Sequence, residues 1–189
     1  MGGKNDKKKL SDEQKKYILN QAKKSIYNIK TESNKVGVGF LCIIPFPKRF
    51  NIFTVFISDN MSLNKDDISN GKTFTISNET LKKCILIDES RKTYINEKYE
   101  VTFIEIKESD KIDINSFLDI DFEFYENNPN EKYDKKYIYL LHNNSGNTYD
   151  YSLGKLKSIS KENFFLEFMK LDEIKSSIAP ILNIFRFFI

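Results

Sequence analysis

The stretch from Ile26 to Ile44 reads IYNIKTESNKVGVGFLCII, and it decides the fold class. Apolar residues here change from helical spacing to alternation with a period of two, which indicates extended strands. The polar residues 32–35, Glu-Ser-Asn-Lys, are a turn signal between the two halves, and prolines at 45 and 47 end the second half. This stretch therefore predicts a β-hairpin.

A short helix is predicted before the hairpin and a series of strands after it. Ser11-Asp12-Glu13-Gln14 is a capping-box pattern, and Ile18 and Ala22 fall on one helical face, so we predict a helix over residues 12–24. Strand patterns separated by turn-forming residues follow at 52–58, 72–77, 83–88, 99–107, 136–142, 148–158, 164–170 and 180–188. Many short strands without intervening helices indicate an all-β sandwich or barrel.

Composition limits the classes of function. The chain has 189 residues, enough for one double-lobed domain, and its net charge of +3 is not the concentrated basic surface of a nucleic-acid-binding protein. One histidine and two separated cysteines cannot supply structural zinc spacing, and the sequence holds no calcium-loop or phosphate-loop pattern, so we expect no cofactor. Cys42 and Cys84 lie in apolar runs and are predicted to be small core residues.

The N-terminal residues bear on location. They are rich in lysine and contain no apolar segment of a secretory signal, and the chain contains no apolar stretch of membrane-spanning length, so we predict a cytoplasmic protein. Met1-Gly2-Gly3 with the following lysines invites a lipid-anchor interpretation. Asp6, however, stands where myristoylation requires Ser or Thr, so no membrane tether is expected.

Four short segments occur in an order that carries a family resemblance. They are VGVGF at 36–40, FISDNMSL at 56–63, KYEVTFIEI at 98–106 and SSIAPIL at 176–182. In order, they resemble the G-T-G-F strand, the T-N-N-H-V-L histidine segment, the Y-D-V-T/A-I-I-E aspartate segment and the G-S/N-S-G-S-P-I/L nucleophile segment of trypsin-like serine proteases, of the chymotrypsin and glutamyl endopeptidase type. Each motif is loose alone, and the resemblance rests on their order and spacing over most of the chain.

The resemblance implies a fold and a division into domains. The expected fold is all-β, with two packed antiparallel six-stranded barrels and a catalytic triad in the cleft between them. Residues 1–24 would be a basic tail and a short helix, residues 25–115 the first barrel, and residues 116–189 a linker and the second barrel. Family members have further strands after the nucleophile segment, so the second barrel is expected to be incomplete.

The same alignment predicts damage to the catalytic machinery. Met61 replaces the catalytic histidine, and a thioether cannot take a proton from a serine hydroxyl. Glu100 stands at the aspartate position but has no imidazole to orient. Ser177 stands at the nucleophile position, yet the neighbouring glycines of the family motif are Lys175 and Ile178 here, which is expected to deform the oxyanion hole.

These replacements predict a catalytically inactive homologue that binds a peptide or protein in the inter-barrel cleft or along a strand edge. Two alternatives stay open: a weak or unconventional serine endopeptidase acting through Ser177, and a decayed gene copy without selected activity. His142, the only histidine, is not at the triad position and is interpreted as structural. The oligomeric state is not predicted.

Overall fold

One α-helix and eleven strands form the part of the chain that the computed structural model describes, residues 11–45, 51–119, 137–144, 148–159 and 164–168. Two short 3-10 helices lie at Glu108–Asp110 and Ile114–Ser116. The other elements are α1 (Asp12–Ser25), β1 (Ile26–Thr31), β2 (Val36–Pro45), β3 (Ile52–Asp59), β4 (Thr73–Ser77), β5 (Lys82–Leu86), β6 (Thr93–Asn96), β7 (Val101–Glu105), β8 (Leu118–Asp119), β9 (Tyr137–Asn144), β10 (Thr148–Ile159) and β11 (Phe164–Phe168).

The predicted N-terminal helix and its cap are confirmed. Ser11 Oγ accepts a hydrogen bond from the Gln14 backbone N–H at 3.2 Å, and Gln14 Oε1 accepts one from the Ser11 N–H at 2.9 Å. This reciprocal pair satisfies two donors at the helix start. Ile18 and Ala22 are buried, as their shared face predicts.

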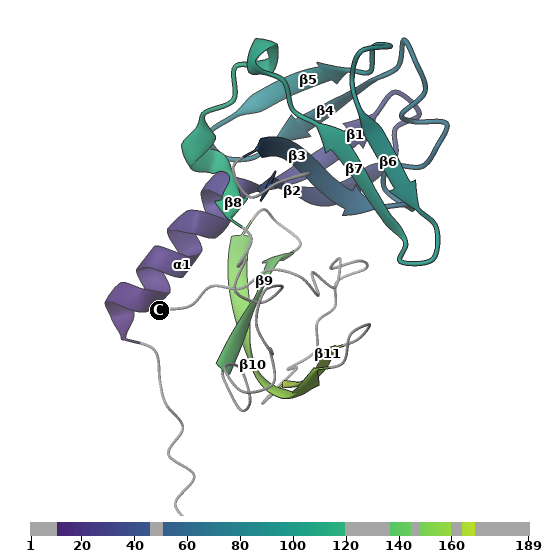
Figure 1. Ribbon diagram of the computed structural model, residues 1–189. Helices are drawn as coiled ribbons and strands as arrows, with labels where there is room; N and C mark the ends of the chain where they lie inside the picture. Colours follow the sequence, from purple (N-terminus) through teal and green to yellow (C-terminus); the bar gives the residue numbers. More distant parts are fainter. Residues whose placement is uncertain (1–10, 46–50, 120–136, 145–147, 160–163, 169–189) are drawn as a thin grey trace, which may run out of the picture.

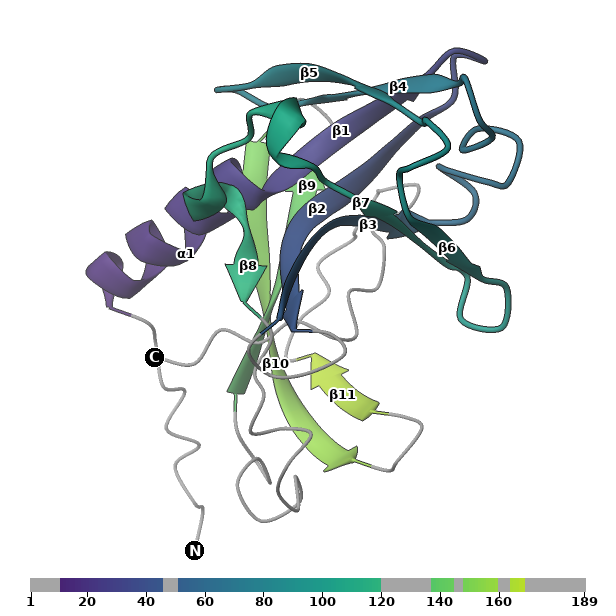
Figure 2. The same cartoon turned by 45° about the horizontal axis from the view of Figure 1, so that its top comes forward.

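An eight-stranded sheet forms the larger layer of the molecule. Its strands lie in the order β5-β4-β1-β2-β3-β7-β6, and β8 adds a short parallel pairing to β2. The predicted hairpin is confirmed as β1 and β2, in register from Ile26 opposite Phe40 to Lys30 opposite Val36. The sheet curls strongly (Figures 1 and 2). The described chain is therefore mostly β, with a curled antiparallel sheet and one N-terminal helix.

Sequence patterning missed two strands and displaced the start of another. Thr93–Asn96 forms β6 and Leu118–Asp119 forms β8, although neither was predicted. The strand predicted from residue 99 begins at Val101, because residues 97–100 form the turn between β6 and β7. Strands of two and four residues are too short to show a convincing alternation.

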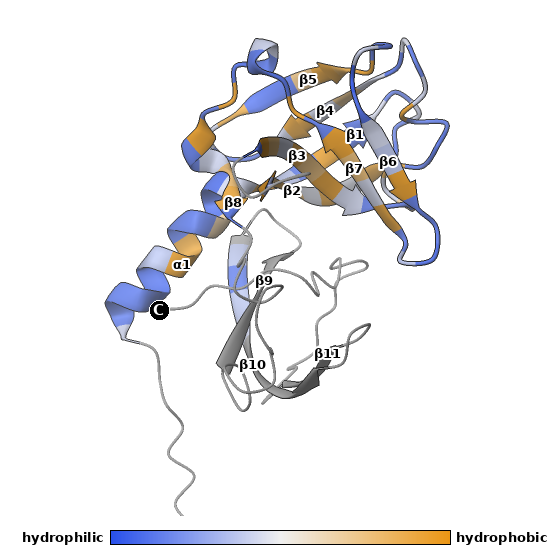
Figure 3. Cartoon of the chain, in the orientation of Figure 1, coloured by the Kyte–Doolittle hydropathy of each residue, from blue (hydrophilic) through white to orange (hydrophobic). Residues whose placement is uncertain are grey.

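Two cores lie on opposite faces of the central strands. Leu41 of β2 and Phe56 of β3 pack in the first, inside the curl, and their neighbours Cys42 and Val55 pack in the second, against α1. Successive residues of a strand point to opposite faces, so both faces of β2 and β3 are covered. This explains why these two strands are apolar almost without interruption, whereas polar and apolar residues mix on the outer strands (Figure 3).

Cys84 corrects one sequence prediction. Cys42 is buried, and burial raises the pKa of its thiol well above the usual range. Cys84 is exposed instead of buried. It lies on β5 at the end of the sheet order, where the strand buries only Ile85 fully and turns its other face to solvent. Apolar neighbours in sequence therefore did not imply burial.

A second, three-stranded sheet has the order β11-β10-β9, in agreement with the strands predicted for this region. It contacts the second core through Tyr149 and Tyr151 of β10. The Tyr149 hydroxyl donates to the Ile26 carbonyl at 3.3 Å, and burial raises the pKa of Tyr149 to about 12. The predicted strand 180–188 lies outside the described residues. Among the described residues, no helix is long and apolar enough to cross a membrane.

Arg91 joins the two ends of the curled sheet. Its Nε donates to the Leu86 carbonyl of β5 at 2.7 Å, and its Nη1 donates to the Glu105 carbonyl of β7 at 2.6 Å. Its guanidinium also forms a bidentate pair with Asp110, at 2.7 and 2.9 Å. The two side chains of this pair are 3% and 9% exposed. Arg91 thus holds β5 beside β7 although the two strands are not paired with each other.

We expect Arg91→Met to destabilise the fold by about 3–5 kcal/mol, because it leaves the Asp110 carboxylate buried without its partner. Chemical denaturation monitored by circular dichroism measures this change. Lys23→Met, which removes the exposed Lys23–Glu79 pair, is the matched control and should change stability by no more than about 0.5 kcal/mol. Equal stability of the two variants would contradict a closing role for Arg91.

Candidate functional site

Two of the three predicted triad positions meet at one end of the curled sheet. β3 ends at Asp59 and β7 begins at Val101, and these two residues are paired in register. Met61 follows the end of β3, and Glu100 precedes the start of β7. The Asn60 N–H donates to the Glu100 carbonyl at 3.1 Å, which ties the two segments together. Ser177, at the third position, lies outside the described residues.

Neither of these two side chains provides a base of the kind the triad requires. Met61 is 69% exposed, so its side chain does not fill the core. A thioether also cannot bind a proton, whether buried or exposed. Glu100 is also exposed, and its backbone has a φ of 51°. This left-handed conformation is uncommon for residues other than glycine, asparagine and aspartate. It lets the chain turn sharply into β7.

The turn that carries Met61 is held by hydrogen bonds on both sides. The Asp59 carboxylate accepts from the Ser62 N–H at 2.7 Å and from the Ser62 hydroxyl at 2.9 Å. The buried Thr102 hydroxyl of β7 lies 2.8 Å from Asn60 Oδ1 and 2.7 Å from the Leu63 carbonyl. These hydrogen bonds hold the turn against the end of the sheet, and the Met61 side chain is exposed on this turn.

Gly37, in the first of the four motifs, packs directly under this turn. A Cβ atom on Gly37 would overlap the side chain of Ser62, which is itself buried. The absence of a side chain at residue 37 thus allows β2 to approach the turn after β3. The structure places the first and second motifs in contact, as far as their described residues are concerned.

The acidic side chain of Asp67, close to Met61 in sequence, is held by hydrogen bonds within the loop and from the β1–β2 turn. Burial by itself would raise the pKa of Asp67, but bonds from Lys35 Nζ at 2.7 Å, the Asn64 N–H at 3.2 Å and the Ser33 hydroxyl at 3.0 Å hold it below its usual range. Within the ranges that the structure describes, no group of three metal-ligating side chains is found. Asp67 anchors the loop between β3 and β4 to the β1–β2 turn.

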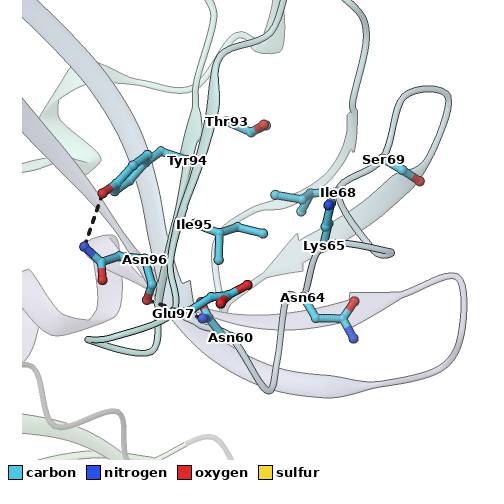
Figure 4. Close-up of a pocket in the computed structure, with 10 residues that line it drawn as sticks. All are labelled: Asn60, Asn64, Lys65, Ile68, Ser69, Thr93, Tyr94, Ile95, Asn96 and Glu97. Carbon is cyan, nitrogen blue, oxygen red and sulfur yellow. Dashed lines mark hydrogen bonds between the residues drawn. The ribbon is translucent and has the colours of Figure 1, made fainter.

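A pocket of about 840 Å³ opens beside this end of the sheet, between β6 and the loop after Met61 (Figure 4). Its apolar surface comes from Ile95 of β6 and Ile68 of the loop, whose side chains point toward each other and join the first core. The other lining residues are polar: Asn60, Asn64, Lys65, Ser69, Thr93, Tyr94, Asn96 and Glu97. This arrangement suits a ligand with an apolar group and several hydrogen-bonding groups.

Sequence analysis did not find this pocket. Its two sides come from residues 60–69 and 93–97, which only the tertiary fold brings together. The one available signal was the run Thr-Tyr-Ile-Asn at 93–96, whose first three residues favour strands. His142, interpreted as structural, lies on β9 opposite Asp150 of β10, in the three-stranded sheet and not in the sheet that carries Met61.

We expect Gly37→Ala to destabilise the protein by about 1–3 kcal/mol, because the added methyl group must displace the buried Ser62 side chain. Ser62→Gly removes the atoms that would clash, so the loss in the double variant should be smaller than the sum of the two single losses. Denaturation curves of the three variants and the parent chain form the cycle that measures this coupling. Additive losses would show that residues 37 and 62 are not in contact.

Comparisons with protein-family models and with curated proteins find no match to this chain. The resemblance to the trypsin-like serine proteases therefore rests on the four sequence motifs alone. A shared fold would in any case leave the function to be argued from the site.

Proposed function

We propose that this chain is a catalytically inactive homologue of the trypsin-like serine proteases and that its remaining role is to bind a peptide or protein. One observation carries the proposal. The two segments that the resemblance assigns to the catalytic histidine and aspartate lie side by side at the ends of β3 and β7, and they carry Met61 and Glu100 instead. This adjacency supports the proposal, and neither Met61 nor Glu100 supplies the base that a triad uses.

The order of the strands supports the finer proposal of a trypsin-like barrel. β5 and β6 follow each other in sequence and lie at opposite ends of the sheet order, so a strong curl brings the two ends toward each other. If β5 and β6 are counted as two halves of one interrupted strand, the sheet has six strand positions. The other five are β1, β2, β3, β4 and β7. We propose that residues 116–189 hold the linker and the second barrel; within this range β8 pairs with β2 of the first sheet, and Ser177 lies outside the described residues.

The chemistry of inactivity follows from the missing imidazole. A serine hydroxyl is a weak nucleophile until a neighbouring base takes its proton. Loss of such a base lowers turnover by about 10⁶-fold in a measured protease. The single histidine of the chain, His142, lies on β9 of the three-stranded sheet. The pocket beside Met61 supports binding as the remaining role.

A fluorophosphonate probe tests the inactivity directly, because it reacts covalently with an activated serine. We expect labelling of the full chain to be no higher than labelling of Ser177→Ala. An active trypsin-like protease treated in parallel verifies the probe. Labelling above the Ser177→Ala level would contradict the proposed inactivity and favour a serine hydrolase.

Restoring the two missing triad groups should not restore activity. Met61→His supplies the base, and Glu100→Asp shortens the carboxylate at a backbone conformation that aspartate tolerates well. We still expect negligible peptide hydrolysis, because Lys175 and Ile178 replace the glycines beside Ser177, and loss of one oxyanion donor costs about 10²–10³-fold. The measurement is turnover of fluorogenic peptides, with Ser177→Ala added as the background. Turnover within about tenfold of a median enzyme rate of 10 s⁻¹ would show an intact oxyanion hole.

A further inference from the structure

We propose that the outer edge of β6 binds an extended peptide segment of a partner protein as an added antiparallel or parallel strand, with one apolar side chain of that peptide in the neighbouring pocket. The inference deepens the proposed function, since it names the surface and the ligand class for the binding role. The inference depends on the proposed binding role and not on whether Ser177 is reactive.

The direction of the backbone groups on β7 follows from two hydrogen bonds. The Ile106 N–H donates to the Thr54 carbonyl at 2.8 Å, so even-numbered residues of this segment turn their backbone groups toward β3. The Glu105 N–H donates to the Lys92 carbonyl at 2.9 Å, so odd-numbered residues turn theirs toward β6. Alternation of this kind is the rule for antiparallel pairs.

The register carries this pattern onto β6. Tyr94 is opposite Phe103 and Asn96 is opposite Val101, so the backbone groups of both face β7. Thr93 and Ile95 are opposite Ile104 and Thr102, and their N–H and C=O groups therefore point away from β7. β6 is the last strand of its sheet, and no other described strand pairs with this edge. Two residues thus offer two donors and two acceptors, the unit that strand addition uses.

The free edge and the pocket coincide. Thr93 and Ile95, whose backbone groups point outward, are both pocket-lining residues. Ile68 stands across the pocket from Ile95, and the two side chains point toward each other (Figure 4). A strand added at this edge would lie over the pocket and place every second side chain against its apolar surface. Backbone pairing and side-chain burial would therefore occur in one binding event.

The two opposite charges at the pocket, on Lys65 and Glu97, favour a neutral ligand. Lys65 is on the loop side of the pocket and Glu97 is on the β6 side, and neither forms an ion pair with any described residue. A phosphate-bearing ligand would meet the Glu97 carboxylate, and a strongly cationic one would meet the Lys65 ammonium group. A neutral peptide segment with an apolar side chain is repelled neither by the Glu97 carboxylate nor by the Lys65 ammonium group. At about 3.3 Å per residue, the four residues of β6 match about four residues of peptide.

The test begins with a displayed library of random linear seven-residue peptides, selected on the immobilised full chain. Enriched peptides are synthesised, and their dissociation constants are measured by fluorescence anisotropy. We expect the enriched peptides to share an apolar residue at a fixed position and to bind in the micromolar range.

Thr93→Pro separates strand addition from other modes of binding. Its N–H points away from β7, so proline removes a donor needed by the added strand but no hydrogen bond of the sheet, and proline is tolerated at such edge positions. The matched control is Cys84→Pro on β5. The Ile87 N–H donates to the Lys72 carbonyl, so odd-numbered residues of that strand face β4, and the Cys84 N–H points outward at the other free edge.

We expect Thr93→Pro to weaken peptide binding at least tenfold and Cys84→Pro to change it less than twofold. A second variant, Lys65→Trp, places a bulky side chain at the pocket and should weaken binding without touching β6, whereas Lys16→Trp on α1 should not. Absence of enriched peptides, or unchanged binding by both Thr93→Pro and Lys65→Trp, would overturn the inference.

Two other results would also overturn it. Self-association that Thr93→Pro abolishes, measured by sedimentation velocity, would make a second copy of the chain the occupant of the edge. Weaker peptide binding by Cys84→Pro, with unchanged binding by Thr93→Pro, would place the binding site on β5. None of these outcomes bears on serine reactivity, so failure here leaves the fluorophosphonate result to decide catalytic inactivity on its own.

Discussion

The bidentate pair between Arg91 and Asp110 is the interaction on which the curled sheet depends. A sheet of short strands has two edges, and each edge presents unpaired backbone groups. Arg91 donates to one carbonyl at the end of β5 and to another on β7, and so connects the first strand of the sheet order with the next-to-last one. Asp110 neutralises the guanidinium where it is almost fully buried. This connection spans the gap between β5 and β7, which are not paired with each other.

Coverage of β2 and β3 on both faces explains why the sheet has two cores. The first core fills the inside of the curl, and the second lies between the sheet, α1 and β10. In the middle of both strands, apolar residues on either face are buried, and only the strand ends expose apolar side chains, at Val36 and Ile52. Outer strands bury one face only, and Cys84 shows the consequence for a residue on the other face.

The candidate site results from the same geometry. Adjacent antiparallel strands place the end of one beside the start of the next, so Met61 and Glu100 meet because β3 and β7 are paired. The pocket lies beside them because β6 leads into β7 through the turn at residues 97–100, and the loop after β3 stays close to Gly37. Hydrogen bonds to Asp59 and Asp67 hold that loop in place. A hydrogen-bonded turn, a strand edge that no other described strand pairs with, and a partly apolar pocket are thus adjacent, although they belong to separate stretches of the chain.

Local patterns determined the helix, its cap, the hairpin and most of the strands, because periodicity and turn residues act over a few neighbouring positions. They also placed Met61, Glu100 and Ser177 in a family order, which is a statement about sequence alone. Only the tertiary structure decided that Cys84 is exposed, that the outer edge of β6 pairs with no other described strand, and that residues 60–69 and 93–97 line a pocket. These features depend on which distant segments pack together. No local pattern specifies that, because the closing contact of Arg91 and the approach of Gly37 to Ser62 exist only in the folded chain.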